Sequence, residues 1–178
     1  PAAYSWPSSM SEAHQRELRS EIQRLIHLLG LGTSIYNIET REGTDGKAYL
    51  MECSPRGGGN RLAECLEYAT GVKLVENAVR AALGMPTVGV EQRPYDGFWA
   101  ELILHSDRPG VFDSLWIDDA ISGAVIERDL WIEPGTNIGG FRAANEAIGT
   151  LILRFETEEQ LQAIMQEPSC YVKVLLRR

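Results

Sequence analysis

The sequence predicts an α+β fold, in which antiparallel sheets pack against helices, from three observations. Two runs rich in β-branched and aromatic residues flank Asp45-Gly46, a pair typical of a tight hairpin. Before them, apolar residues recur at helical spacing between residues 18 and 29. Beyond Pro94, short strand-like runs are separated by turn residues and include one helix signal. With 178 residues, 44% of them apolar, the chain has enough material for one domain or two small lobes.

The first predicted element is a helix that begins after Ser9 and ends at Gly30. The proline- and serine-containing residues 1–8 before it are expected to form a connecting segment. Ser9 and Glu12 match the capping-box pattern, in which each side chain bonds a backbone N–H of the first turn. Gly30 is expected to stop the helix because glycine adopts the left-handed backbone of a C-terminal cap. Its apolar face should pack on the hairpin and consists of Leu18, Ile22, Leu25, Ile26 and Leu29.

The hairpin over residues 36–54 follows, and its register decides which side chains share a face. A two-residue loop at Asp45-Gly46 places Glu39 opposite Glu52 and Asn37 opposite Ser54. Opposed side chains lie roughly 5.5 Å apart at Cβ, where like charges repel, so a cation is expected between the two glutamates. The other face should be an apolar floor of Tyr36, Ile38, Tyr49, Met51 and Cys53.

Two other registers remain open for this hairpin. A four-residue loop would place Glu52 opposite Asn37 and keep Glu39 diagonally on the same face. A bulged loop would instead split the two glutamates between the faces. The alternative to a functional site is a solvated strand face that carries two ordinary glutamates.

A glycine-rich loop follows the second strand and strengthens the functional interpretation. Gly57, Gly58 and Gly59 let the backbone come close to a phosphate or carboxylate, and Arg56 offers a bidentate guanidinium. Asn60 stands where the N-cap of the next helix is expected. A glycine loop that opens a helix is an arrangement that binds anions.

The remaining elements complete the predicted α+β organisation. Two helices are expected near residues 61–69 and 73–83, with Gly71 and Gly84 as stops. Thr157 and Gln160 match a capping box for a later helix through Met165. Five strands are expected in the second half, over residues 98–105, 111–117, 124–133, 150–156 and 171–176. The chain is therefore divided into a first part, residues 1–88, and a second part, residues 89–178.

Charge and cysteine usage exclude several classes of function. A net charge of −8 argues against nucleic acid or an anionic membrane as the main partner. The three cysteines have neither metal-ligand nor disulfide spacing, which predicts reduced thiols and a cytoplasmic protein. No apolar run reaches the length of a membrane span.

Two segments carry a resemblance to a known family. Asn37-Ile38-Glu39 and Glu52-Cys53-Ser54-Pro55-Arg56 resemble the metal-binding hairpin of ATP-grasp ligases, particularly the biotin carboxylase and carbamoyl phosphate synthetase group. The resemblance continues at residues 69–72 with the helix that follows them, and again at residues 140–149. It implies the C-terminal half of an ATP-grasp fold, with residues 1–88 as the C-terminal ATP-grasp subdomain and residues 89–178 as an antiparallel α+β lobe.

The resemblance also implies roles for individual residues. Glu39 and Glu52 correspond to the acids that hold the Mg²⁺ ions bridging the ATP phosphates. Ser54 occupies a third metal-binding position, where the family usually has an asparagine, and Asn37 opposite it is a candidate source of the missing oxygen. Arg56 corresponds to the catalytic arginine that contacts the phosphate or the acyl substrate.

The function implied is that of a C-terminal fragment of an ATP- and Mg²⁺-dependent ligase. Such an enzyme activates a small-molecule carboxylate as an acyl phosphate, which an amine or similar nucleophile then attacks. The chain contains only Lys47, Lys73 and Lys173 and nothing like the family's nucleotide-binding lobe. An upstream lobe of the same polypeptide is therefore the expected partner, and the fragment alone is expected to be inactive. The alternative is a non-catalytic ligand-binding or assembly module that retains the scaffold.

Overall fold

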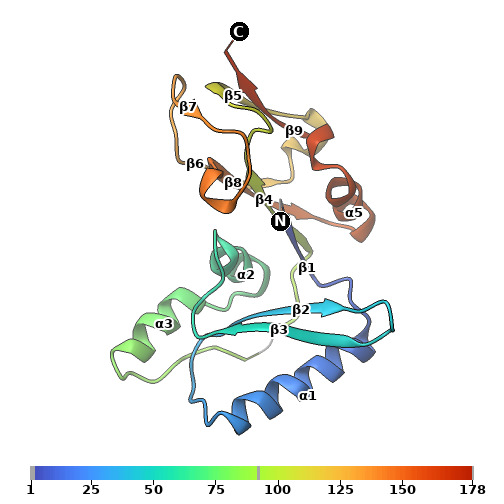
Figure 1. The fold of residues 1–178 in the computed structure, drawn as a ribbon, viewed down its shortest axis with the longest axis vertical. Helices are drawn as coiled ribbons and strands as arrows, with labels where there is room; N and C mark the ends of the chain where they lie inside the picture. The colour runs from blue at the N-terminus through green and yellow to red at the C-terminus, as the bar shows by residue number, and fades with distance from the viewer. Residues whose placement is uncertain (1–2, 92, 178) are drawn as a thin grey trace. The chain divides into compact units, whose positions relative to one another are not determined.

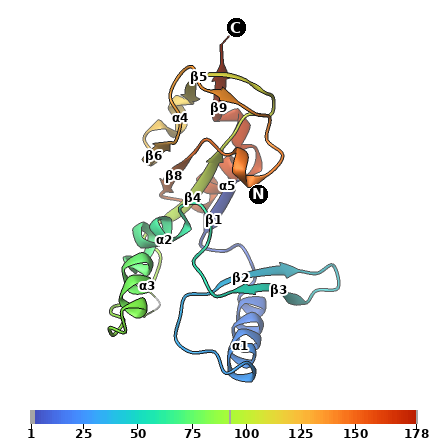
Figure 2. The same ribbon diagram turned by 60° about the vertical axis from the view of Figure 1, so that its left-hand side comes forward.

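The computed structural model describes residues 3–91 and 93–177, which form two compact units (Figures 1 and 2). The hairpin unit comprises residues 8–67, 71–91 and 93, and the C-terminal unit comprises residues 3–7, 68–70 and 94–177. In chain order the elements are β1 (Ala3–Trp6), α1 (Glu12–Leu28), β2 (Asn37–Glu42), β3 (Ala48–Ser54), α2 (Leu62–Thr70), α3 (Leu74–Ala82), β4 (Phe98–Leu104), β5 (Gly110–Ile117), α4 (Asp119–Ser122), β6 (Val125–Leu130), β7 (Asn137–Ile138), η1 (Ala144–Glu146), β8 (Gly149–Phe155), α5 (Glu158–Gln166), η2 (Pro168–Cys170) and β9 (Val172–Leu176).

The sheets confirm the predicted α+β class. Within the described residues every strand pair is antiparallel, and the strand orders are β1-β4-β8-β6, β2-β3 and β7-β5-β9. All five strands expected in the second half are present as β4, β5, β6, β8 and β9. The helix predicted after Thr157 is α5, and the capping box between Thr157 and Gln160 is formed.

The core of the C-terminal unit lies on one face of its four-stranded sheet. Alternate residues of β4 and β8 point to this face, which α5 covers with Leu161 and Ile164. Burying this apolar surface is the main force that holds the unit together. The fully or almost fully buried strand residues in this core include Ala100, Leu102, Leu104, Leu151, Leu153 and Phe155.

The N-terminal segment differs from the prediction. Residues 3–6 are not a connecting segment but the edge strand β1, which pairs with β4 so that Trp6 faces Trp99. Tyr4 and Trp6 supply the aromatic side chains that favour a strand, although the surrounding prolines and serines resemble a linker. Pro1 and Ala2, which belong to the same predicted segment, lie outside the described residues.

Helix α1 ends as predicted but begins two residues later. Its N-cap is Ser11, whose hydroxyl accepts a hydrogen bond from the His14 amide at 3.2 Å, so the Ser9–Glu12 capping box is wrong. Gly30 follows the helix with φ +59° and donates its N–H to the His27 carbonyl. Together with the Leu31 amide bound to Ile26 O, this is the Schellman arrangement that glycine favours.

The hairpin β2–β3 contains a bulge that the sequence did not reveal. Near the turn, Arg41 faces Tyr49, and the loop spans residues 43–47, closed by the Gly43 amide bound to the Lys47 carbonyl at 2.8 Å. The register shifts by one between Glu39 and Thr40, which leaves Met51 as an extra residue in β3. The predicted two-residue loop is therefore wrong. The bulge shifts the register back by one residue, so the pairs from Glu39 to Asn37 are the predicted ones.

Candidate functional site

The carboxylate face of the hairpin has the predicted pairing. Glu39 faces Glu52 and Asn37 faces Ser54, so these four side chains belong to one face of the β2–β3 ladder. The longer loop shifts the register one way and the bulge at Met51 shifts it back. The open alternative in which a bulge separates the two glutamates is therefore wrong for this hairpin.

The opposite face of the hairpin differs from the predicted apolar floor. Because the bulge changes the alternation in β3, Tyr49 lies on the carboxylate face opposite Arg41, and Leu50 takes a place on the floor. Tyr49 is 44% exposed and Met51 is 62% exposed, so the prediction that both belong to the floor is wrong. Helix α1 runs along the hairpin in both ribbon views (Figures 1 and 2) and contacts β3.

Each of the two glutamates has a polar partner on the same strand. Arg41 forms an ion pair with Glu39 at 2.6 Å between Nη2 and Oε1. Ser54 donates its hydroxyl hydrogen to Glu52 Oε1 at 2.5 Å. Arg41 therefore supplies a positive charge beside the glutamate pair, where a cation was expected. Sequence reasoning missed Arg41, although residues i and i+2 of one strand share a face.

The donor set of this face fits a magnesium ion that also has phosphate ligands. Within residues 3–91 and 93–177, no cluster of three or more His, Cys, Asp or Glu side chains could hold a metal ion. Mg²⁺ does not require such a cluster, because it keeps several waters and binds proteins through one or two carboxylates plus substrate phosphates. Glu39 and Glu52 supply two carboxylates, and Asn37, opposite Ser54, adds an amide group to the same face.

The glycine loop after β3 folds back against the start of β2. A Cβ at Gly58 would lie 3.0 Å from Leu62 Cδ2 and 3.4 Å from Asn37 Oδ1, so glycine permits this close approach. Asn60 has a left-handed backbone with φ +53°, and Arg61 occupies the N-cap of α2 without a side-chain cap. The prediction of Asn60 as the N-cap is therefore wrong, because an N-cap residue has an extended backbone.

Arg56 lies on the surface beside this loop. Its Nη1 donates to the neighbouring Gly57 carbonyl at 2.8 Å, and its backbone amide donates to Ser54 O at 2.8 Å. No carboxylate in the described part of the chain forms an ion pair with the Arg56 guanidinium. Most of the N–H donors of the Arg56 guanidinium therefore remain available to an anion.

A second polar cluster fastens the hairpin loop to α1. His14 bonds Glu42 Oε1 through Nδ1 and the Gly46 carbonyl through Nε2, the latter at 2.9 Å. The hydrogen bond to the Glu42 carboxylate raises the pKa of His14, and the Gly46 carbonyl adds to the effect. In the loop itself, Tyr49 donates to Asp45 at 2.6 Å, which lowers the pKa of Asp45. These contacts fix the loop end of the hairpin to α1.

Two of the three lysines contact residues that do not belong to the hairpin. Lys73 Nζ lies 3.8 Å from Glu76 on α3, and Lys173 Nζ lies over the Trp116 ring at 4.8 Å from its centroid. Neither contact involves the carboxylate face.

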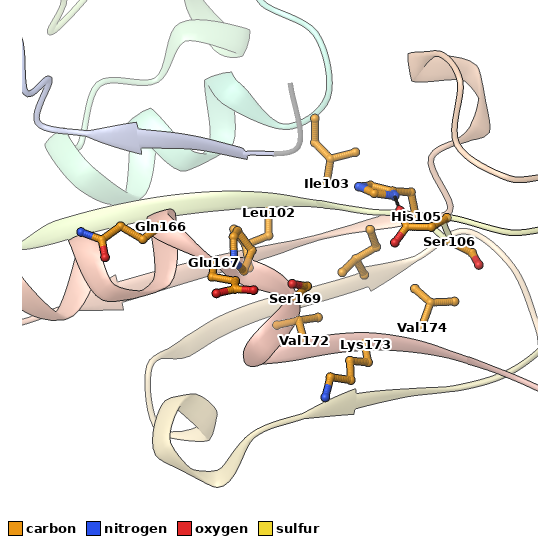
Figure 3. A pocket seen from close by; sticks show the side chains of 13 residues that line it. Leu102, Ile103, His105, Ser106, Gln166, Glu167, Ser169, Val172, Lys173 and Val174 are labelled. Atoms are coloured by element: carbon orange, nitrogen blue, oxygen red, sulfur yellow. Dashed lines mark ion pairs between the residues drawn. The ribbon is translucent and has the colours of Figure 1, made fainter.

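The C-terminal unit has a cavity of about 430 Å³ between the end of β4, η2 and β9 (Figure 3). Leu102, Ile103, Val172 and Val174 make much of its wall apolar. His105 Nδ1 lies 3.7 Å from Asp107, and the ring stacks on Phe141 with centroids 4.1 Å apart. Figure 3 shows Glu167 well apart from His105, so these two ionisable groups do not converge on one point.

The chain has the fold of part of several ATP-grasp ligases. Phosphoribosylglycinamide synthetase from Anaerococcus prevotii superposes with a TM-score of 0.80 at 19% identity, over 99% of this chain and 46% of that one. L-amino acid ligase from Bacillus licheniformis gives 0.82 at 16% identity, over 99% and 44%. The biotin carboxylase domain of the Hydrogenobacter thermophilus 2-oxoglutarate carboxylase, in complex with MgADP, ADP and bicarbonate, gives 0.71 at 17% identity, over 98% and 39%.

These comparisons confirm the predicted resemblance at the level of the fold. This chain spans less than half the length of each of these three proteins. No protein-family model matches the sequence, and no curated protein matches it. No described helix is long and apolar enough to cross a membrane.

Proposed function

We propose that this chain is the C-terminal part of an ATP- and Mg²⁺-dependent ATP-grasp ligase. The observation that carries the proposal is the register of β2 and β3, which sets Glu39 opposite Glu52 on one face beside the Ser54-Pro55-Arg56 segment. The proposal is further supported by the fold, which is shared with ligases over at least 98% of the chain.

Each residue of the site has a distinct role in this proposal. Glu39 and Glu52 would hold Mg²⁺, which supplies positive charge that neutralises the ATP phosphates. Ser54 donates its hydroxyl to Glu52 at 2.5 Å and so fixes the direction in which that carboxylate points. Ser54 would be the third and shorter metal ligand, and Asn37, which faces it, would supply an additional carbonyl oxygen.

Arg56 would bind the carboxylate substrate and stabilise negative charge on the group being transferred. A guanidinium fork binds a carboxylate or phosphoryl group through two parallel hydrogen bonds, which also fixes its orientation. Donors that already point at the place where charge develops lower the barrier without reorganising during the reaction. In the proposed reaction the carboxylate is activated as an acyl phosphate. An amine or a similar nucleophile then attacks the acyl phosphate and displaces phosphate.

The contacts to adenine and ribose would come from an upstream nucleotide-binding lobe of the same polypeptide. The chain spans 39–46% of the length of the three ligases compared, which leaves room for such a lobe. Lys73 and Lys173 are engaged with Glu76 and Trp116 and do not lie on the carboxylate face. The isolated chain is therefore proposed to lack ATP turnover.

A non-catalytic ligand-binding or assembly module is the second candidate, and the polar partners of the two glutamates favour it. Glu39 forms an ion pair with Arg41, and Glu52 accepts a hydrogen bond from the Ser54 hydroxyl. Both carboxylates therefore have polar partners without a metal ion. A scaffold that had lost catalysis could keep this arrangement unchanged. The two candidates differ in whether the face binds a divalent ion.

Paramagnetic NMR with Mn²⁺ in place of Mg²⁺ tests the proposal on the chain itself, because Mn²⁺ also prefers carboxylate oxygens. We expect Mn²⁺ to broaden the amide signals of residues 37–40 and 52–54 selectively, and Glu52→Gln to reduce that broadening. Glu133→Gln, an exposed glutamate of the C-terminal unit, is the matched control and should change nothing. Uniform broadening that is unaffected by Glu52→Gln would favour the non-catalytic module.

A further inference from the structure

A groove of about 620 Å³ begins beside Arg56 and extends along α3 within the hairpin unit. One wall is the segment at residues 33–36 that leads into β2, and the other wall is the face of α3 that carries small side chains. The Pro55-Arg56-Gly57 segment also lines the groove. The groove therefore shares Arg56 with the proposed site.

Two hydrogen-bonded clamps hold the groove walls in place. Asn77 is only 3% exposed, donates its amide to the Lys73 and Val88 carbonyls and accepts from the Val88 N–H at 2.8 Å. This triple contact ties the segment after α3 to the helix. On the other side, Tyr36 Oη donates to the Gly32 carbonyl at 2.8 Å and fixes the segment that leads into β2. The groove is thus preformed, which lowers the entropy cost of binding.

The chemistry of the lining combines hydrocarbon with a single charge. Ala78, Ala81 and Ala82 leave space along α3, and Ile35, Leu74 and Val90 add apolar surface. Arg56 is the charged side chain among the described residues that line the groove. Its guanidinium bonds a neighbouring backbone carbonyl and forms no ion pair within the described chain, as noted above. An occupant that complements this surface carries a negative charge at one end and a hydrocarbon group at the other.

We infer that this groove selects the acid on which the enzyme acts: a carboxylate with a branched aliphatic or aromatic group, whose carboxylate lies on Arg56 and whose hydrocarbon lies along α3. The inference rests on the proposed function for the statement that the bound acid is the substrate. The binding itself requires neither ATP nor a metal ion, so it is measured separately. A small acid without a hydrocarbon group leaves the alanine wall uncovered and binds less tightly.

Titration of the 178-residue chain with 4-methylpentanoate, followed by amide chemical shifts, tests the inference. We expect shifts at residues 33–36, 55–57 and 78–82, and binding about tenfold tighter than that of acetate, because part of the additional hydrocarbon leaves water. The neutral 4-methylpentanamide should also bind about tenfold more weakly, since it cannot pair with a guanidinium as an ion. Equal binding of all three compounds, or shifts confined to other residues, would overturn the inference.

Two variants locate the ligand. Ala81→Leu fills the groove and should weaken 4-methylpentanoate binding about tenfold while acetate binding stays unchanged, whereas Arg56→Gln should weaken both acids. Ala13→Leu, at an exposed position of α1, and Arg24→Gln, at an exposed ion pair, are matched controls that should leave binding unchanged. Unchanged 4-methylpentanoate binding in Ala81→Leu overturns the inference.

The Mn²⁺ measurement on the same samples separates this inference from the proposed function. Selective broadening at residues 37–40 and 52–54 without carboxylate binding overturns the groove assignment and supports the metal site. Carboxylate binding without selective broadening supports the groove and contradicts the metal role of Glu39 and Glu52.

Discussion

Removing the Arg41 side chain should strengthen divalent-ion binding at the hairpin. Arg41 Nη2 lies 2.6 Å from Glu39 Oε1, so the guanidinium competes with a metal ion for this carboxylate. The two side chains are 67% and 47% exposed, so the pair contributes only about 0.2–1 kcal/mol. Arg41→Gln is therefore expected to raise Mn²⁺ affinity by about 1.4- to 5-fold at low ionic strength.

The assay is Mn²⁺ titration of the chain, followed by the broadening of the Glu39 and Glu52 amide signals. The gain should shrink in high salt, because salt screens exposed charges. Arg24→Gln is a close control, since Arg24 forms an equally short 2.6 Å pair with Glu21 at similar exposure, away from the hairpin. Weaker Mn²⁺ binding in Arg41→Gln, or an equal gain in Arg24→Gln, would refute the competition between Arg41 and the metal ion.

Three further predictions concern His14, Glu52 and Leu153. The hydrogen bond to Glu42 raises the pKa of His14, so the folded state favours the protonated imidazole. The stability that this contact adds to the fold is therefore present below the unfolded pKa of His14 and is lost as pH rises through the folded pKa. The thermal midpoint should therefore exceed that of His14→Ala by more at pH 5.5 than at pH 8.5, and the reverse order contradicts the contact with Glu42. If Glu52 bridges two Mg²⁺ ions while Glu39 holds one, Glu52→Gln should lower the ATP-dependent activity of the proposed full-length ligase more than Glu39→Gln, because the loss of a bridging charge weakens both ions; equal rates would reject that assignment. Leu153→Ala should cost about 2–5 kcal/mol in chemical denaturation, since Leu153 is fully buried in the C-terminal core, and a loss below about 1 kcal/mol would show that the site collapses or is poorly packed.

The sequence predicted the pairing of Glu39 and Glu52, although the path through the turn was different. Alternation and Asp45-Gly46 identified a hairpin, but nothing in the side chains marks Met51 as a bulged residue. A bulge depends on how both strands twist and pack, which is a property of the pair and not of one strand. The error in loop length and the hidden bulge offset each other at Glu39, whereas Tyr49 and Met51 were placed on the wrong face.

Other differences arise where two local signals compete. Ser9 and Ser11 both suit an N-cap, and only the path of the backbone selects Ser11. Asparagine is common both at N-caps and in left-handed turns, and Asn60 adopts the left-handed turn. In the same loop, Gly58 comes close to Asn37. The α3 groove was not predicted at all, because it depends on Asn77 and Val88 meeting across the segment that follows the helix. Side-chain chemistry thus located the candidate site, and tertiary contacts determined its shape.

Calorimetric titration with Mg²⁺-ATP tests the central claim most directly, because the claim divides the nucleotide site between this chain and an upstream lobe. The 178-residue chain should bind Mg²⁺-ATP no more tightly than about 1 mM, or about 4 kcal/mol, since two carboxylates and one arginine replace only part of the contacts. The intact polypeptide should bind at least about a hundredfold more tightly and lose that gain with Glu52→Gln. Micromolar binding by the isolated chain, or tight binding by the intact Glu52→Gln variant, would contradict the assignment of Glu39 and Glu52 as the metal-binding half of the site.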